Sequence, residues 1–147
     1  MSTAQAIRVV AGAVTTSTAS RWHNNILDGG RLAAKRWAVY ELGAFNPASF
    51  RSNDFSPDPE ANYVAWRTAG VKDLKVSDLS SLGAAFADNF AEVPQFVDEA
   101  KGDLHLGPTS PCRDRGVPVD KGAAVTDMDG EERPKTGPTD VGPDEVP

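Results

Sequence analysis

The sequence is short of cysteine and of long apolar runs. Cys112 is the single cysteine among 147 residues, which excludes an internal disulfide and a metal site built from cysteines. No stretch approaches the roughly 18 apolar residues of a membrane helix. The first 20 residues also lack the basic start and unbroken apolar run of a signal peptide. The sequence therefore predicts neither a membrane span nor an export signal.

Basic residues are also scarce relative to acidic ones. The chain has 15 Lys and Arg against 21 Asp and Glu, a formal net charge of −6, and a pI near 4.8. Proteins that bind nucleic acid neutralise its phosphates with basic surfaces, so nucleic acid is not an expected partner. His23 and His105 have no Cys or His at ligand spacing, which argues against a zinc site.

Turn-forming residues are abundant and unevenly distributed. The length fits one domain or part of one, and 13 Gly and 11 Pro favour many turns over long helices. Composition changes near residue 101. From Gly102 to Pro147 there are seven Gly and seven Pro in 46 residues, which predicts loops and very short strands.

Short strands and one helix are predicted before residue 101. Five segments rich in β-branched or aromatic residues are bounded by turn formers. They are Ala6–Val10, Arg21–Leu27, Arg36–Leu42, Ser49–Phe55 and Tyr63–Arg67. Between residues 75 and 87 the apolar positions recur every three or four residues, which predicts a short helix with Ser77 as its N-cap.

A weak repeat with a period of 28 residues links two of these strands. Trp22–Asp28 aligns with Phe50–Ser56, matching an aromatic, an Asn and a large apolar residue. Such a period is typical of stacked coils. The repeat predicts that the amides of Asn25 and Asn53 bond one above the other, while Leu27 and Phe55 fill the interior. In the alternative interpretation, each Asn marks an unrelated turn.

A series of motifs in the C-terminal half carries a family resemblance. In chain order they are VPQFVD (93–98), GDLHL (102–106), GPTSPCRDRG (107–116), DMDGEERP (127–134) and DVGPDE (140–145). The series resembles the C-terminal region of bacterial right-handed parallel β-helix proteins of the choice-of-anchor Q type, within the pectate-lyase-like superfamily. Arg113, Arg115 and Pro143 depart from the residues usual in that family.

The resemblance implies an all-β fold, the last coils and closing segment of a right-handed parallel β-helix. Residues 1–74 would be coils, 75–101 a short helix and the last coil, and 102–147 a Gly- and Pro-rich closing segment. The chain would then be a fragment that contacts upstream coils or another copy of itself. Its expected role is a non-catalytic structural or binding module, the terminal part of a bacterial secreted or cell-surface protein.

An enzyme acting on acidic polysaccharide is the competing hypothesis. A β-helix lyase needs a base beside a neutralised uronate, and Arg21, His23, Arg51 and Asp54 would line its groove, with Arg67 nearby. A hydrolase needs two carboxylates about 5 to 9.5 Å apart. The candidate pairs are Asp54 with Asp58 and Asp127 with Asp129. The alternative for the basic residues is that they are solvated charges on the outer face of the strands. The alternative for Asp127 and Asp129 is that they form a structural turn.

The sequence contains residues for two further kinds of ligand site, one for sugar rings and one for calcium. Exposed aromatic rings would bind polysaccharide, but the same rings can fill a core; they are Trp22, Trp37, Tyr40, Tyr63 and Trp66. Asp127, Asp129 and Gly130 form an acidic turn in which Asx side chains can bond backbone N–H groups and pair with Arg133. No cofactor is expected, with calcium at Asp127 and Asp129 as the alternative, although the EF-hand spacing is not met.

Overall fold

The computed structural model describes most of the chain in eight ranges. They are residues 3–10, 21–27, 35–42, 48–55, 64–66, 72–118, 125–134 and 138–146. In residues 3–10, 64–66, 72–73 and 35–42 other than Val39, the description covers the backbone alone. The strands are β1 (Thr3–Val10), β2 (Arg21–His23), β3 (Lys35–Leu42), β4 (Ser49–Arg51), β5 (Val64–Trp66), β6 (Lys72–Leu74), β7 (Phe96–Asp98) and β8 (Asp103–Leu106). The 3₁₀ helices are η1 (Val76–Leu82), η2 (Ala84–Phe86) and η3 (Glu99–Lys101).

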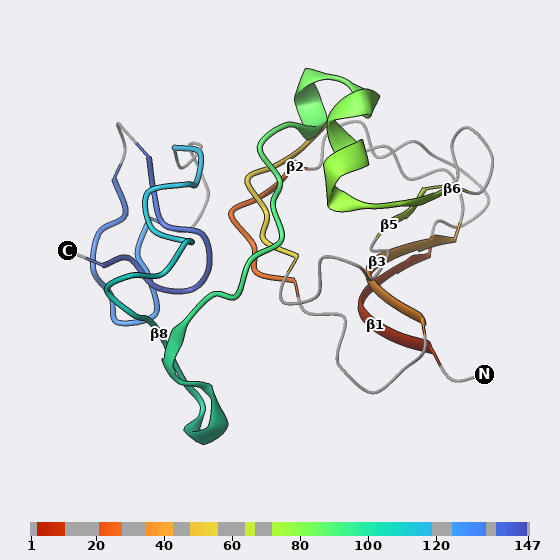
Figure 1. The fold of residues 1–147 in the computed structure, drawn as a ribbon. Helices are drawn as coiled ribbons and strands as arrows, with labels where there is room; N and C mark the ends of the chain where they lie inside the picture. The colour runs from red at the N-terminus through yellow and green to blue at the C-terminus, as the bar shows by residue number, and fades with distance from the viewer. Residues whose placement is uncertain are drawn as a thin grey trace.

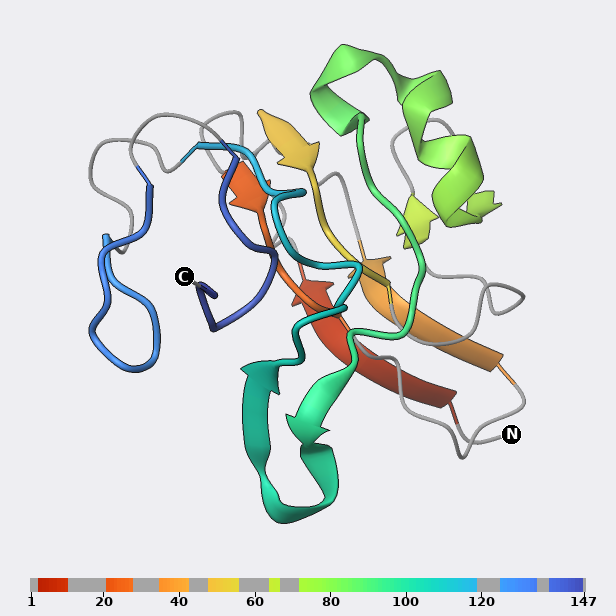
Figure 2. The same cartoon turned by 60° about the vertical axis from the view of Figure 1, so that its left-hand side comes forward.

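The described strands form three separate sheets. A four-stranded sheet has the order β1-β3-β5-β6, in which β6 runs antiparallel to β5 and the other pairs are parallel. Strands β2 and β4 form a parallel pair with Trp22 opposite Phe50. Strands β7 and β8 form an antiparallel hairpin that projects away from the other sheets (Figure 2). The first five strands confirm the positions of the predicted strand segments, although β2, β4 and β5 are shorter than predicted and β1 begins earlier.

The predicted right-handed parallel β-helix is wrong for this chain. Within the described residues the strands are short and divided among small sheets, and no continuous solenoid sheet joins them. Two of the strand pairs are antiparallel. The physical reason is that residues 76–86 form 3₁₀ turns and residues 96–106 form a hairpin, where further parallel rungs would be needed.

The helical segment near residues 75–87 is present, but as two 3₁₀ helices. The helix begins after Lys75 rather than at Ser77, because the Asp78 carboxylate accepts the Lys75 backbone N–H at 3.2 Å. Gly83, at φ +109°, separates η1 from η2. Leu79 is the buried residue of η1 and anchors the segment on the core.

Three stacked asparagines organise the centre of the molecule. The Asn25 Nδ2 donates to Asn53 Oδ1 at 2.8 Å, and the Asn53 Nδ2 donates to Asn89 Oδ1 at 3.0 Å. We call these three residues the asparagine ladder. The residues just before its members are Asn24, Ser52 and Asp88, and each has a positive φ, as expected for short polar side chains in tight turns. The predicted stacking of Asn25 on Asn53 is confirmed.

Two buried clusters lie on either side of the ladder's strands. The first contains Leu27, Val39, Phe50, Phe55 and Leu79, so Leu27 and Phe55 fill one interior as predicted. The second joins Phe90 to residues of the C-terminal half, namely Leu106, Cys112 and Val141. In Figure 1 the C-terminal loops, drawn in blue, stand beside β2 on the side away from β5 and β6.

Candidate functional site

Asn24 fixes the C-terminal part of the chain to the end of β2. We call the described residues between 102 and 146 the closing segment. The Asn24 side chain donates to the Val117 carbonyl at 2.8 Å and to Thr139 Oγ1 at 2.9 Å, and it accepts the Val117 N–H at 2.8 Å. Its own carbonyl accepts the Gly142 N–H at 2.9 Å. Asn24, one of the three positive-φ residues that precede the ladder, therefore bonds to the closing segment at Val117, Thr139 and Gly142.

Two glycines allow the closing segment to approach this closely. A Cβ at Gly142 would lie 2.6 Å from Ile26 Cδ1, and one at Gly116 would lie 2.7 Å from the Thr139 carbonyl oxygen and 2.9 Å from Asn24 Cγ. These distances are shorter than real side-chain contacts. A side chain at position 116 would thus collide with the Thr139 backbone and Asn24, and one at position 142, where φ is +116°, would be strained and would have to displace the end of the Ile26 side chain.

Asp54 and Cys112 form a buried polar contact between the ladder strands and the closing segment. The Cys112 thiol donates to Asp54 Oδ2 at 3.4 Å, and the Glu92 N–H donates to Asp54 Oδ1 at 3.0 Å. Burial raises the pKa of Asp54 to about 6. Burial, together with the neighbouring Asp54 charge, raises the pKa of Cys112 to about 12. At neutral pH Cys112 is therefore a protonated thiol and a poor nucleophile.

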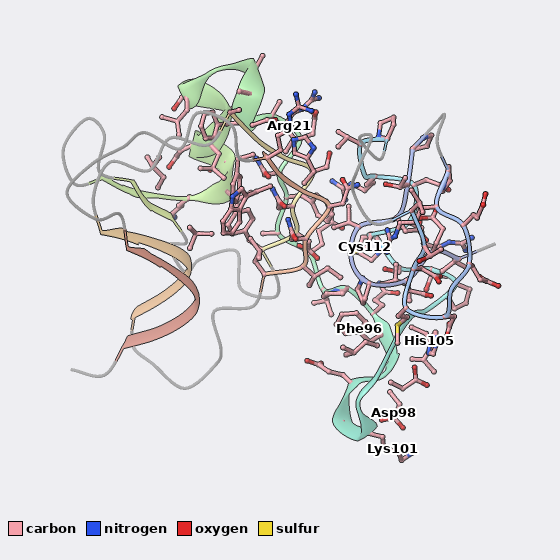
Figure 3. The ribbon with its side chains drawn as sticks, turned by 180° about the vertical axis from the view of Figure 1, so that it is seen from behind. Arg21, Phe96, Asp98, Lys101, His105 and Cys112 are labelled. Atoms are coloured by element: carbon pink, nitrogen blue, oxygen red, sulfur yellow. The ribbon has the colours of Figure 1, made fainter. Side chains whose placement is uncertain are left out.

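The four candidate lyase residues do not converge. Arg21 is exposed at the start of β2, and Figure 3 shows it well separated from Cys112, which contacts Asp54. His23 and Arg51 are register partners, and His23 Nε2 lies 2.8 Å from Ser49 Oγ. Asp54 is buried under Cys112. The carboxylate that meets Arg51 is instead Asp88.

An open pocket of about 600 Å³ lies where the ladder meets the closing segment. Its lining is polar on the ladder side and rich in proline on the other; the residues are Arg51, Ser52, Asp88, Asn89, Arg115, Gly116, Val117, Pro118 and Pro138. Arg51 forms an ion pair with Asp88. Arg115 pairs with Glu92 at 2.6 Å and lies 3.8 Å above the Phe90 ring. The pocket thus presents two fixed guanidinium groups.

Asp127 and Asp129, the two predicted metal ligands in the acidic turn, bind different partners. Asp127 Oδ1 accepts the N–H groups of Asp129 and Glu131, and its Oδ2 accepts the N–H of Glu145. Although burial acts in the opposite direction, these bonds hold the pKa of Asp127 below its usual value. The Asx bonding predicted for this turn is confirmed. Asp129 instead points to His105, with Oδ2 2.7 Å from Nε2.

His105 and Asp129 belong to a group that sequence reasoning missed. The structure adds Asp144, and one ligand atom from each of the three residues lies within 4.8 Å of the others. The other ring nitrogen of His105, Nδ1, lies 2.5 Å from Asp103 Oδ1. Hydrogen bonds to Asp103 and Asp129 raise the pKa of His105 to about 9. The Asp-x-His spacing at 103–105 was the available signal, but nothing local pointed to Asp144.

Arg133 has partners other than the predicted acidic turn. It is buried, and its guanidinium donates to the carbonyls of Asp140 at 3.2 Å and Gly142 at 2.7 Å. Its Nη1 lies 3.6 Å from Glu145 Oε2. The expected pairing with Asp127 and Asp129 is therefore replaced by a clamp on the last turn of the closing segment.

Trp22 packs in the interior rather than on a sugar-binding face. Its ring stacks on Phe50 with centroids 6.4 Å apart, against the first core cluster. The other predicted aromatic side chains lie outside the described residues; they are Trp37, Tyr40, Tyr63 and Trp66. Asp58 and Arg67 lie outside them as well. Among the described residues, no helix has the length and apolar character needed to cross a membrane.

Comparisons with known proteins give no match. No protein-family model matches the chain, and neither a curated protein nor a solved structure is similar to it.

Proposed function

We propose that the chain is a non-catalytic structural or binding module in which the closing segment covers and locks the ends of the asparagine-ladder strands. The observation that carries the proposal is the burial of Asp54. This carboxylate is the acid that the competing lyase site would require, and its exposed fraction is 0%. A general acid or base must reach its substrate within hydrogen-bond distance, and Asp54 is held by Glu92 and Cys112 instead.

The contacts of the closing segment support a locking role. Gly142 and Val117 are bonded to Asn24, and Val141 bonds to the carbonyl of Cys112 at 2.9 Å. Phe90 and Val141 share one buried cluster, which joins the last rung of the ladder to the segment. The segment thus satisfies backbone groups and buries apolar surface that the strands cannot cover alone.

The family resemblance supports a location for this module within a larger protein. Choice-of-anchor regions lie near the C-terminus of bacterial secreted and cell-surface proteins. By that resemblance we place this chain in such a protein, near the position where a surface anchor would follow.

A pair of glycine substitutions tests the locking role. Gly142→Ala adds a methyl group that meets Ile26, whereas Gly83→Ala adds one at a similar φ in open space. Both carry the backbone strain of a positive φ, so their difference measures the lost fit of the segment. The reporter is Cys112, which is fully buried. We expect a thiol reagent under native conditions to label Gly142→Ala at least tenfold faster than Gly83→Ala.

Two results would contradict the proposal. Equal labelling rates and equal unfolding free energies for Gly142→Ala and Gly83→Ala would show that the segment does not lock the strands. Cleavage of polygalacturonate by the unmodified chain, lost in Asp54→Asn, would show that the protein is an enzyme.

Binding of an acidic glycan in the pocket is a second candidate function. Arg51 and Arg115 both line it and are each about 40% exposed. A uronate carboxylate can accept paired hydrogen bonds from a guanidinium, so this arrangement favours an acidic sugar over a neutral one.

A further inference from the structure

Three segments that are distant in the sequence bring an imidazole and two carboxylates together. His105 lies on β8, Asp129 in the acidic turn and Asp144 near the end of the described chain. Their ligand atoms all lie within 4.8 Å of one another. Figure 3 shows His105 between the β7–β8 hairpin and the C-terminal loops. We propose that His105, Asp129 and Asp144 bind a divalent transition-metal ion of the zinc class.

Asp144 provides an independent reason for a cation here. The residue is 5% exposed, and its Oδ2 accepts the Leu106 N–H at 2.7 Å. Among the described residues, no other hydrogen-bond donor or basic side chain contacts this carboxylate. Buried carboxylates are ordinarily paired with a cation or bound to a metal. The second oxygen of Asp144 accepts no hydrogen bond from another described residue and is not itself fully buried, so a metal ion can reach it.

Asp103 acts as a positioning residue for His105. Its Oδ1 lies 2.5 Å from Nδ1, on the side of the ring opposite Asp129. An imidazole that donates its Nδ1–H to a carboxylate presents the Nε2 lone pair to a metal, and such outer partners orient metal-binding histidines. Asp103 would not touch the metal.

The ligand types select the class of cation. Calcium takes six to eight oxygen ligands, whereas this group supplies one nitrogen and two carboxylates. Imidazole and carboxylate together suit zinc, with water completing the coordination. The competing explanation is a protonated His105 that bridges Asp103 and Asp129 with no metal bound.

Titration of the full chain with zinc chloride, followed by calorimetry, tests the site. We expect saturable one-to-one binding that is weakened at least 100-fold in His105→Gln. The matched control is His23→Gln, because His23 is the chain's one other histidine and bonds to Ser49; its affinity should change less than threefold. Asp103→Asn should weaken binding by about 10- to 100-fold, as outer partners of metal-bound histidines do.

A second measurement covers the case in which His105→Gln fails to fold. Zinc added to the unmodified chain should shift the imidazole NMR signals of His105 and leave those of His23 unchanged. The proposal is overturned if zinc gives no saturable binding, if both histidines respond equally, or if calcium binds more tightly than zinc. Absence of any zinc effect would leave His105 as a purely structural bridge.

Discussion

The thiol of Cys112 lies 3.4 Å from the carboxylate of Asp54, and both side chains are fully buried. Desolvation governs both groups, raising the pKa of Asp54 to about 6 and that of Cys112 to about 12. Near neutral pH the pair is therefore a neutral thiol donating to an ionised carboxylate. The hydrogen bonds from Glu92 and Cys112 and the charge of Arg115 offset part of the cost of burying this anion.

Asp54→Asn should flatten the dependence of stability on pH. Between its ordinary value of 3.8 and about 6, Asp54 is protonated in the folded chain and ionised in the unfolded chain. Its contribution to stability therefore falls as pH rises through that window and is constant above it. The loss is about 2–3 kcal/mol. Urea unfolding from pH 4 to 6, below the range in which the raised pKa of His105 causes a decline of its own, should show this decline in the unmodified chain and in Asp98→Asn, and a much smaller one in Asp54→Asn. A decline of equal size in Asp54→Asn would contradict the assignment.

Asn53→Ala should be among the most destabilising changes in the ladder. The buried side chain donates to the Trp22 carbonyl and to Asn89, and it accepts from the backbone and side-chain nitrogens of Asn25. Removing it leaves buried partners unsatisfied, at roughly 3 kcal/mol in total. Ser80→Ala, at an exposed position, is the control. Chemical denaturation measures the difference, and a loss for Asn53→Ala no larger than that for Ser80→Ala would show that the ladder carries no stability.

Arg133→Met should cost about 3–5 kcal/mol, because it removes a buried cation and leaves a largely buried carboxylate without its partner. The affected groups are Glu145 and the carbonyls of Asp140 and Gly142. Adding Glu145→Gln should recover part of that loss, as measured by a double-mutant cycle of unfolding free energies. Arg113→Met, which removes one exposed bond to the Pro108 carbonyl, should cost far less. Additive losses for Arg133→Met and Glu145→Gln would exclude direct coupling.

Arg51→Gln should weaken binding of a uronic-acid oligosaccharide about tenfold or more. A charge-assisted hydrogen bond contributes about 1.5–3 kcal/mol, and about 1.4 kcal/mol corresponds to a tenfold change in affinity. Arg113→Gln removes the same charge from a residue outside the pocket lining and should leave affinity unchanged. Calorimetry with oligogalacturonate measures both variants. Equal weakening in both would indicate a general effect of charge rather than a site.

The sequence by itself determined the local elements. Segments rich in β-branched or aromatic residues between turn formers located β1 to β5, and apolar spacings of three and four located the helical segment. The match of Trp22–Asp28 with Phe50–Ser56 located two rungs of the ladder. These features depend on residues close in the chain, so local pattern is sufficient to specify them.

Tertiary structure alone decided the fold class and the sites. The third rung, at Asn89, follows Asn53 by 36 residues, because the 3₁₀ helices lengthen that connection and hide the repeat. Parallel strand pairs that suggest a continuing coil can equally end in a hairpin, since pairing between distant strands is not encoded locally. The burial of Asp54 under Cys112 and the meeting of His105 with Asp144 likewise join residues 58 and 39 positions apart. Such contacts cannot be read from local sequence, because only the tertiary packing decides which distant polar groups are buried next to each other.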